Sequence, residues 1–192
     1  RGDQVLLQVH LPQPDSGNYR FRFMSTGSGR FDVWSSSQFG TSNMLTAIPA
    51  PENFPPIVDY VLPDNDQHMV DSWACSPHVL TVANYYNEVT YVNSLGDTVT
   101  VTGVEDDIAA TSSKGPTRTG LNKPDVAATG DITFSAAPLS WIAQLESTND
   151  PRLAEGGMHL RNGGSSMASP VVAGAAALYL QRCPDAPHTE VI

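Results

Sequence analysis

Apolar and polar residues alternate along the first part of the chain, up to about residue 48. A period of two is typical of β-strands with one buried face, and the Ser- and Gly-rich residues 25–29 predict a turn between two such strands. The clearest apolar positions are Val5, Leu7, Val9 and Leu11, followed by Tyr19, Phe21 and Phe23. We therefore predict a small all-β sandwich domain within residues 1–68.

The pattern changes in the later part of the chain, residues 69–192. Before it, residues 49–63 are rich in proline, which lacks a backbone N–H for sheet pairing and therefore indicates a connector. Residues 79–83 form a short, nearly continuous apolar run, as expected of a strand buried on both faces. Val99 and Val101 indicate another strand. The Ser-, Thr- and Gly-rich sequence that follows, up to Gly164, predicts loops.

The clearest helix begins near Ser166 and continues to about Arg182. Small and apolar residues surround it on every side, which predicts that it is buried and closely packed. Pro170 lies in its first turn, where a missing N–H costs little, and Cys183 and Pro184 end it.

Two glycines and two serines precede this helix. Gly163 and Gly164 allow a tight loop, and the unpaired N–H groups at a helix start favour an oxyanion formed there. Ser166 is therefore a candidate nucleophile, provided that a neighbouring base can take its proton. A helix N-cap is the more common role of a serine at this position. The pattern alone leaves both interpretations open.

The string Gly164-Ser165-Ser166-Met167-Ala168-Ser169-Pro170, with the small-residue helix after it, resembles the signature of the subtilase family of serine proteases. That signature reads Gly-Thr-Ser-Met-Ala-x-Pro. Ser166 matches the family's nucleophile, and Ser165 stands where threonine is usual. The resemblance also implies that Gly164 and Ser165, in the loop before the nucleophile, contact the substrate.

Three upstream segments extend the resemblance. Residues 112–116 and 123–130 are similar to the family's Ser-Ser-x-Gly-Pro and Lys-Pro-Asp-Val-x-Ala-Pro-Gly segments, with Thr129 in the place of a proline. Residues 78–83 are similar to the strand that precedes them in the family. The resemblance therefore covers residues 69–192 and implies an α/β fold with a mostly parallel sheet and a buried nucleophile helix. Residues 1–68 would be an inserted domain.

The other catalytic groups of a subtilase do not occur in this sequence. The family places an Asp, a His and an oxyanion Asn before the Ser, but no histidine here is followed by glycine, as the family's His motif requires. Asp15-Ser16-Gly17 matches the Asp motif in letters, yet it follows Gln-Pro rather than an apolar strand. We interpret it, and the overlapping Gly17-Asn18, as a turn. We interpret His159 as a surface histidine.

The composition narrows the possible partners. A formal charge of −10 without a Lys/Arg cluster argues against binding nucleic acid. The sequence has no run of about 18 apolar residues, so it predicts no membrane-spanning helix. Catalysis by a serine needs no cofactor. The acidic segments 64–66 and 105–107 could bind structural Ca²⁺ but lack the spacing of a known site, so we interpret them as solvated turns. Cys75 and Cys183 could form a disulfide or remain free thiols.

The leading hypothesis is a secreted serine endopeptidase that cleaves proteins or peptides through an acyl-enzyme on Ser166. We expect both ends of the chain to continue into a longer protein, whose upstream part supplies the missing groups. The isolated chain should then be inactive. The alternative is a degenerate protease that acts as a binding or scaffold protein through its β-domain.

Overall fold

The computed structural model describes residues 24, 26–29, 32–34, 44 and 46–191. The chain divides into two compact units, Arg1–Pro63 and Asp64–Ile192. In the first unit, the described residues include a short 3₁₀-helix, Pro55–Asp59, inside the predicted proline-rich connector. The strands predicted before residue 24 lie outside the described residues. The inserted β-domain and its boundary at residue 68 therefore remain predictions.

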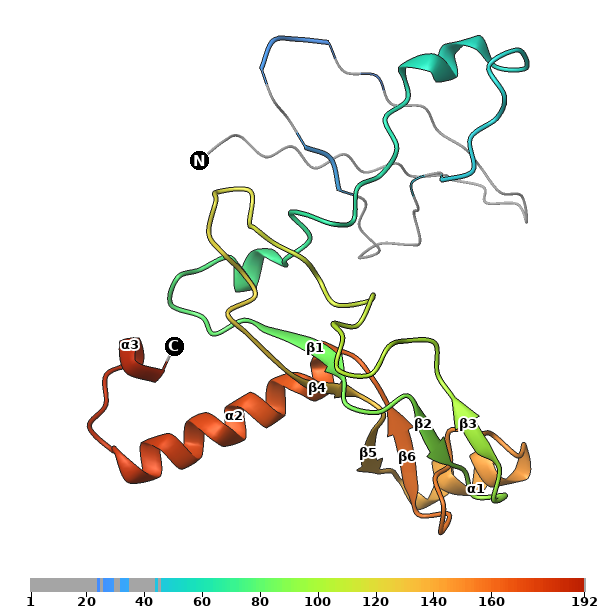
Figure 1. Cartoon of the computed structure of the whole chain (residues 1–192), viewed down its shortest axis with the longest axis vertical. Helices are drawn as coiled ribbons and strands as arrows, with labels where there is room; N and C mark the ends of the chain where they lie inside the picture. The colour runs from blue at the N-terminus through green and yellow to red at the C-terminus, as the bar shows by residue number, and fades with distance from the viewer. Residues whose placement is uncertain (1–23, 25, 30–31, 35–43, 45, 192) are drawn as a thin grey trace. The chain divides into compact units, whose positions relative to one another are not determined.

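The second unit contains strands and helices in mixed order (Figure 1). In chain order its elements are a 3₁₀-helix (Ser72–Ala74), β1 (Val82–Tyr86), β2 (Thr90–Val92), β3 (Thr98–Thr100), β4 (Val126–Asp131), β5 (Thr133–Ala136), α1 (Leu139–Ser147), β6 (His159–Asn162), α2 (Ser165–Arg182) and α3 (His188–Val191).

The parallel pair β1–β4 carries the long helix α2. Val82 pairs with Val126, and the register continues to Tyr85 and Thr129 before it shifts by one residue. A parallel pair needs a long connection, and here residues 87–125 supply it. The N-terminal part of α2 packs against both strands, as Figure 1 shows. We call β1, β4 and α2 the nucleophile half.

The other strands and α1 form a second region, which we call the lobe: β2, β3, β5, β6 and α1. Two antiparallel pairs, β2–β3 and β5–β6, lie beside α1 (Figure 1). Its apolar core consists of Ile142, Leu145, Leu153 and Leu160. Ile142 and Leu145 are three residues apart on α1 and therefore face the same side of the helix. The lobe thus buries an apolar core of its own.

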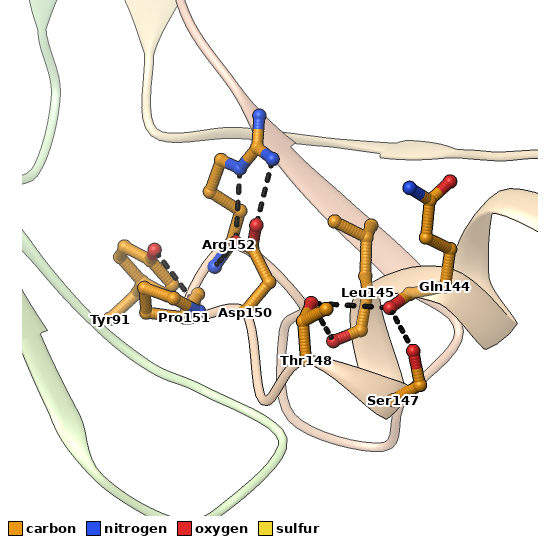
Figure 2. Close-up of polar contacts among 8 residues, drawn as sticks. All are labelled: Tyr91, Gln144, Leu145, Ser147, Thr148, Asp150, Pro151 and Arg152. Carbon is orange, nitrogen blue, oxygen red and sulfur yellow. Dashed lines mark hydrogen bonds and ion pairs between the residues drawn. The ribbon is translucent and has the colours of Figure 1, made fainter.

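Backbone and aromatic contacts join the β2–β3 hairpin to the rest of the lobe. Ser94 N–H donates to the carbonyl oxygen of Leu153 at 2.8 Å, and the rings of Tyr91 and Phe134 meet edge to face. Figure 2 shows that the Tyr91 hydroxyl donates to the Pro151 carbonyl oxygen, at 2.9 Å, next to the pair Asp150–Arg152. Burial raises the pKa of Tyr91, which keeps this donor protonated. Residues distant in sequence therefore meet in one small core.

The sequence predicted some of these elements and missed others. The helix from Ser166 to Arg182 is confirmed, with its start one residue earlier. The strand predicted at residues 79–83 begins at Val82 instead, and the strand at Val99 is β3. The prediction of loops up to Gly164 was wrong, because β4, β5, α1 and β6 lie there.

The prediction that α2 is buried on every side was also wrong for this chain. Only Ala168 of α2 is buried, whereas Leu178 is 69% exposed and Tyr179 and Leu180 are each 39% exposed. The physical reason is that β1 and β4 make the main contacts with the helix among the described elements, and α3 adds only a contact between Tyr179 and Glu190.

Candidate active site

Ser166 lies in the first turn of α2, with an exposed side chain. The residue before the helix, Gly164, has φ +118°, a conformation that L side chains rarely adopt. Its carbonyl oxygen accepts the N–H of Met167 at 2.8 Å and starts the helix. In the described part of the chain, no group hydrogen-bonds the Ser166 hydroxyl. Ser166 is therefore not an N-cap, and its hydroxyl is available for chemistry.

The loop before Ser166 is held against the end of β4. Gly164 N–H donates to the carbonyl oxygen of Gly130 at 2.6 Å. A Cβ on Gly130 would lie 2.5 Å from the Asn84 Cβ, 2.7 Å from the Gly164 oxygen and 2.9 Å from the Ala168 Cβ. Only glycine fits this position, because backbone and fully buried atoms surround it. The parallel strands therefore fix where α2 begins.

The three upstream segments that resemble the family meet around the start of β1. Lys123 Nζ donates to the Val79 carbonyl oxygen and to Asp125 Oδ2, both at 2.7 Å, and its side chain is only 3% exposed. Asp125 Oδ2 also accepts the N–H of Thr81 at 2.7 Å. Burial raises the pKa of Asp125, but the hydrogen bonds from Lys123 and Thr81 outweigh it, so the pKa is below its usual value. Gly115 lies so close to the Lys123 carbonyl that no side chain would fit.

A small cavity of about 210 Å³ opens beside the first turn of α2. Ser165 and Ser169 line it from α2, and Thr81, Val82 and Ser113 line it from β1 and the adjacent loops. Ser169 Oγ donates to the Ser165 carbonyl oxygen at 2.9 Å, which fixes this turn. Ser165 therefore faces a cavity next to Ser166, whereas Gly164 lies in the loop between β6 and α2.

Asn84 of β1 is a buried polar residue beneath the same turn. It is 0% exposed, and its amide nitrogen and oxygen have no hydrogen-bond partner among the residues that the structure describes. Its Cβ lies next to Gly130, directly under the first turn of α2. An unpaired buried amide costs roughly 1–3 kcal/mol in the free energy of unfolding. The first turn of α2 therefore packs on a polar side chain that destabilises the fold.

A model of the subtilase family matches residues 18–191. The chain belongs to the subtilase family. This confirms the resemblance in the sequence around Ser166. It also implies an α/β fold, with which the parallel β1–β4 pair and α2 agree.

Two curated proteins are similar to parts of this subtilase chain. The serine protease AprX of Bacillus subtilis (strain 168) is 38% identical over 105 residues, which is 54% of this chain and 23% of AprX. The uncharacterized protein aq_aa18 of Aquifex aeolicus (strain VF5) is 43% identical over 75 residues, which is 38% of this chain and 32% of that protein. The chain thus spans about a quarter to a third of the length of these relatives. No solved structure matches it significantly.

The described histidines of this subtilase chain do not contact Ser166. His78 Nδ1 lies 3.3 Å from His188 Nε2, and His159 is exposed at the start of β6. Asp15 and Asn18, which match two subtilase motifs only in letters, lie outside the described residues. The structure therefore brings together the nucleophile loop and the three upstream segments, but no base reaches Ser166 within the part it describes.

The acidic turns and the cysteines have ordinary local contacts. Asp64 accepts hydrogen bonds from the Asp66 N–H and the Gln67 amide, and Asp66 pairs with Lys114. Among the described residues, no three His, Cys, Asp or Glu side chains gather as metal ligands, and no helix is long and apolar enough to cross a membrane. Cys75 and Cys183 are free, partly buried thiols.

Sequence reasoning missed the residues that support the nucleophile loop from β4 and β6. Asp131 ends β4 and pairs with Arg161 of β6, and Gly130 precedes it. Gly130 belongs to residues 123–130, which resemble a family segment, so the resemblance could have identified it. No sequence pattern identifies the ion pair of Asp131 with Arg161, because 30 positions separate the two residues.

Proposed function

We propose that this chain carries the nucleophile of a subtilisin-type serine endopeptidase. The observation that carries the proposal is the exposed Ser166 hydroxyl at the start of α2, behind a glycine loop fixed to β4. Membership of the subtilase family and the likeness to AprX support it. Gly164 and Ser165 would contact the substrate beside the nucleophile.

The proposed reaction is acyl transfer to Ser166. A histidine base outside this chain takes the proton of Oγ while Oγ attacks the scissile carbonyl carbon. The Ser166 N–H donates to the oxyanion that forms. When the C–N bond breaks, the histidine gives the proton to the leaving amine, and water then hydrolyses the acyl-enzyme by the same steps. The reaction uses no cofactor.

We further propose that another part of the protease domain covers α2 and supplies the base, the orienting carboxylate and the oxyanion Asn. The exposed apolar residues on the outer turns of α2, among them Leu178, support this arrangement. The isolated chain should therefore hydrolyse peptides negligibly. The substrates would be proteins or peptides, and an extracytoplasmic location rests on family membership alone.

The test is labelling with a serine-reactive fluorophosphonate probe. We expect the full-length parent protein to be labelled at Ser166, and neither the isolated chain nor the parent with Ser166→Ala to be labelled. Ser169→Ala is the matched control, because Ser169 lies one helical turn away in the same segment and hydrogen-bonds only backbone. It should leave labelling intact.

The other outcomes separate the remaining hypotheses. Labelling of the isolated chain would mean that a base lies within it after all, and would direct attention to His159. A parent protein that is folded but unlabelled would reject the enzyme. It would favour the alternative, a scaffold protein that binds its partner through the β-domain.

A further inference from the structure

The ends of β4 and β6 are joined by an ion pair next to the nucleophile loop. Arg161 Nη2 donates to Asp131 Oδ1 at 2.5 Å, and the Asp131 and Arg161 side chains are only 10% and 22% exposed. Asp131 is the last residue of β4, and Arg161 is the next-to-last residue of β6. The pair therefore links the two strands at the point from which the chain leaves β6 for Ser166.

The Asp131 carboxylate also touches the loop itself. A Cβ on Gly163 would lie 2.7 Å from Asp131 Oδ1, so the glycine backbone packs directly against the carboxylate. The next residue, Gly164, donates its N–H to Gly130, the neighbour of Asp131. Both glycines of the nucleophile loop thus rest on the last two residues of β4.

The apolar core of the lobe holds β6 from the other side. Leu160, next to Arg161, is 2% exposed and belongs to the apolar core of the lobe. Successive residues of a strand face opposite sides, so Leu160 anchors β6 to the lobe while Arg161 reaches β4. The position of the loop is then set by the lobe core and the ion pair together.

The Asp131–Arg161 pair is expected to contribute little to the free energy of unfolding. Taking two charges out of water costs about as much as their attraction returns, and apolar replacements of similar size are often neutral or stabilising. This pair is also incompletely satisfied, because Arg161 Nε has no partner among the described residues. Its advantage over an apolar contact is that it fixes one geometry at the loop.

We propose that Asp131 and Arg161 are positioning residues for Ser166. The ion pair holds Gly163 and Gly164 so that the Ser166 hydroxyl and N–H are placed for attack. This inference rests on the proposed function. A nucleophile displaced by about 1 Å can lose roughly 100-fold in rate even where the fold survives. Loss of the pair should therefore lower kcat and leave KM unchanged.

The experiment compares two double variants of the full-length protein. Asp131→Leu with Arg161→Met replaces the pair by apolar side chains of similar size, which avoids an unpaired buried charge. Asp150→Leu with Arg152→Met is the matched control, since it makes the same exchange in the exposed pair of the lobe. Steady-state kinetics, the rate of fluorophosphonate labelling and Tm are measured for each. Arg161→Lys tests whether a retained charge restores activity.

We expect the first variant to lose about 10- to 100-fold in kcat and in labelling rate, with KM and Tm close to the parent's. The control should keep the parental kcat, and Arg161→Lys should keep more activity than the double variant. Parental kcat in the first variant would overturn the inference. So would a loss of activity that only follows a loss of folded protein, because the pair would then act on stability alone. If the parent is never labelled, the proposed function fails and this inference fails with it.

Discussion

The nucleophile half and the lobe of the second unit are held together by different kinds of contact. The lobe closes an apolar core, in which Leu153 and Leu160 are 1% and 2% exposed. The nucleophile half instead relies on close backbone contacts at Gly130 and on the buried Lys123–Asp125 pair, while α2 leaves Leu178 69% exposed. The lobe therefore has an apolar core of its own among the described residues. For the nucleophile half we have proposed a covering surface from another part of the protease domain.

The first prediction concerns the buried charge of the nucleophile half. Lys123→Met leaves Asp125 without its cation, and breaking a buried pair on one side costs about 3–5 kcal/mol in the free energy of unfolding. Urea denaturation of the chain measures it. Lys114→Met is the control, because the pair of Lys114 with Asp66 is exposed and solvent-screened, so its loss should have a much smaller effect. Equal effects of the two variants would remove the distinction between buried and exposed charges on which the comparison rests.

The second prediction concerns the core of the lobe. Leu160→Ala removes a side chain that is 2% exposed and should lower the free energy of unfolding by about 2–5 kcal/mol. Leu139→Ala makes the same change at a position of α1 that is 72% exposed, and its effect should stay within about 0.5 kcal/mol. If Leu160→Ala has as small an effect as its control, the lobe does not have the closed core that we describe.

The third prediction contrasts two glycines of the nucleophile half. Gly130→Ala places a methyl group against the Gly164 oxygen and the Ala168 Cβ, so it should cost about 1–3 kcal/mol. Gly174→Ala meets open space inside α2 and should raise the free energy of unfolding by about 0.5–1 kcal/mol, because alanine favours helix. Thermal unfolding of both variants gives the sign. A stabilising Gly130→Ala would contradict the close contact of β4 with the nucleophile loop.

The smallest effect is expected for the exposed pair of the lobe. The hydrogen bond from Arg152 holds the pKa of Asp150 below its usual value. Since the folded-state pKa is lowered, the stabilisation is present above the unfolded-state pKa and is lost as pH falls through the folded-state pKa. Arg152→Met should therefore cost about 0–1 kcal/mol at pH 7 and nothing in strong acid. A cost that persists in strong acid would show that packing, not charge, holds this turn.

The elements that the sequence predicted well have strong local signals. Two glycines before Ser165 and the Cys-Pro pair after Arg182 set the ends of α2, because local backbone preferences decide where a helix can start and stop. In α1, the apolar positions Ile142 and Leu145 have the spacing of a helix face, but only over nine residues. So short a signal was missed, and tertiary packing in the lobe core stabilises this helix.

The candidate site shows the same division. Ser166 was predicted because its neighbours in sequence form a specific signature, and the structure places its exposed hydroxyl at the start of α2. The supports of its loop were not predicted. Gly130, Asp131 and Arg161 reach the loop from β4 and β6, and contacts across such distances in sequence leave no periodic pattern along the chain.

The sequence by itself determined the family, the candidate nucleophile and the extent of α2, because each depends on residues that are contiguous along the chain. Only the tertiary structure decided which strand end supports the nucleophile loop, how the β2–β3 hairpin attaches to β5 and to residues 151–155, and which residues of α2 remain exposed. The physical reason is that close packing and partly buried charges depend on where the chain returns in space. Residues as distant as Asp131 and Arg161 acquire a shared role only when the strands that carry them meet.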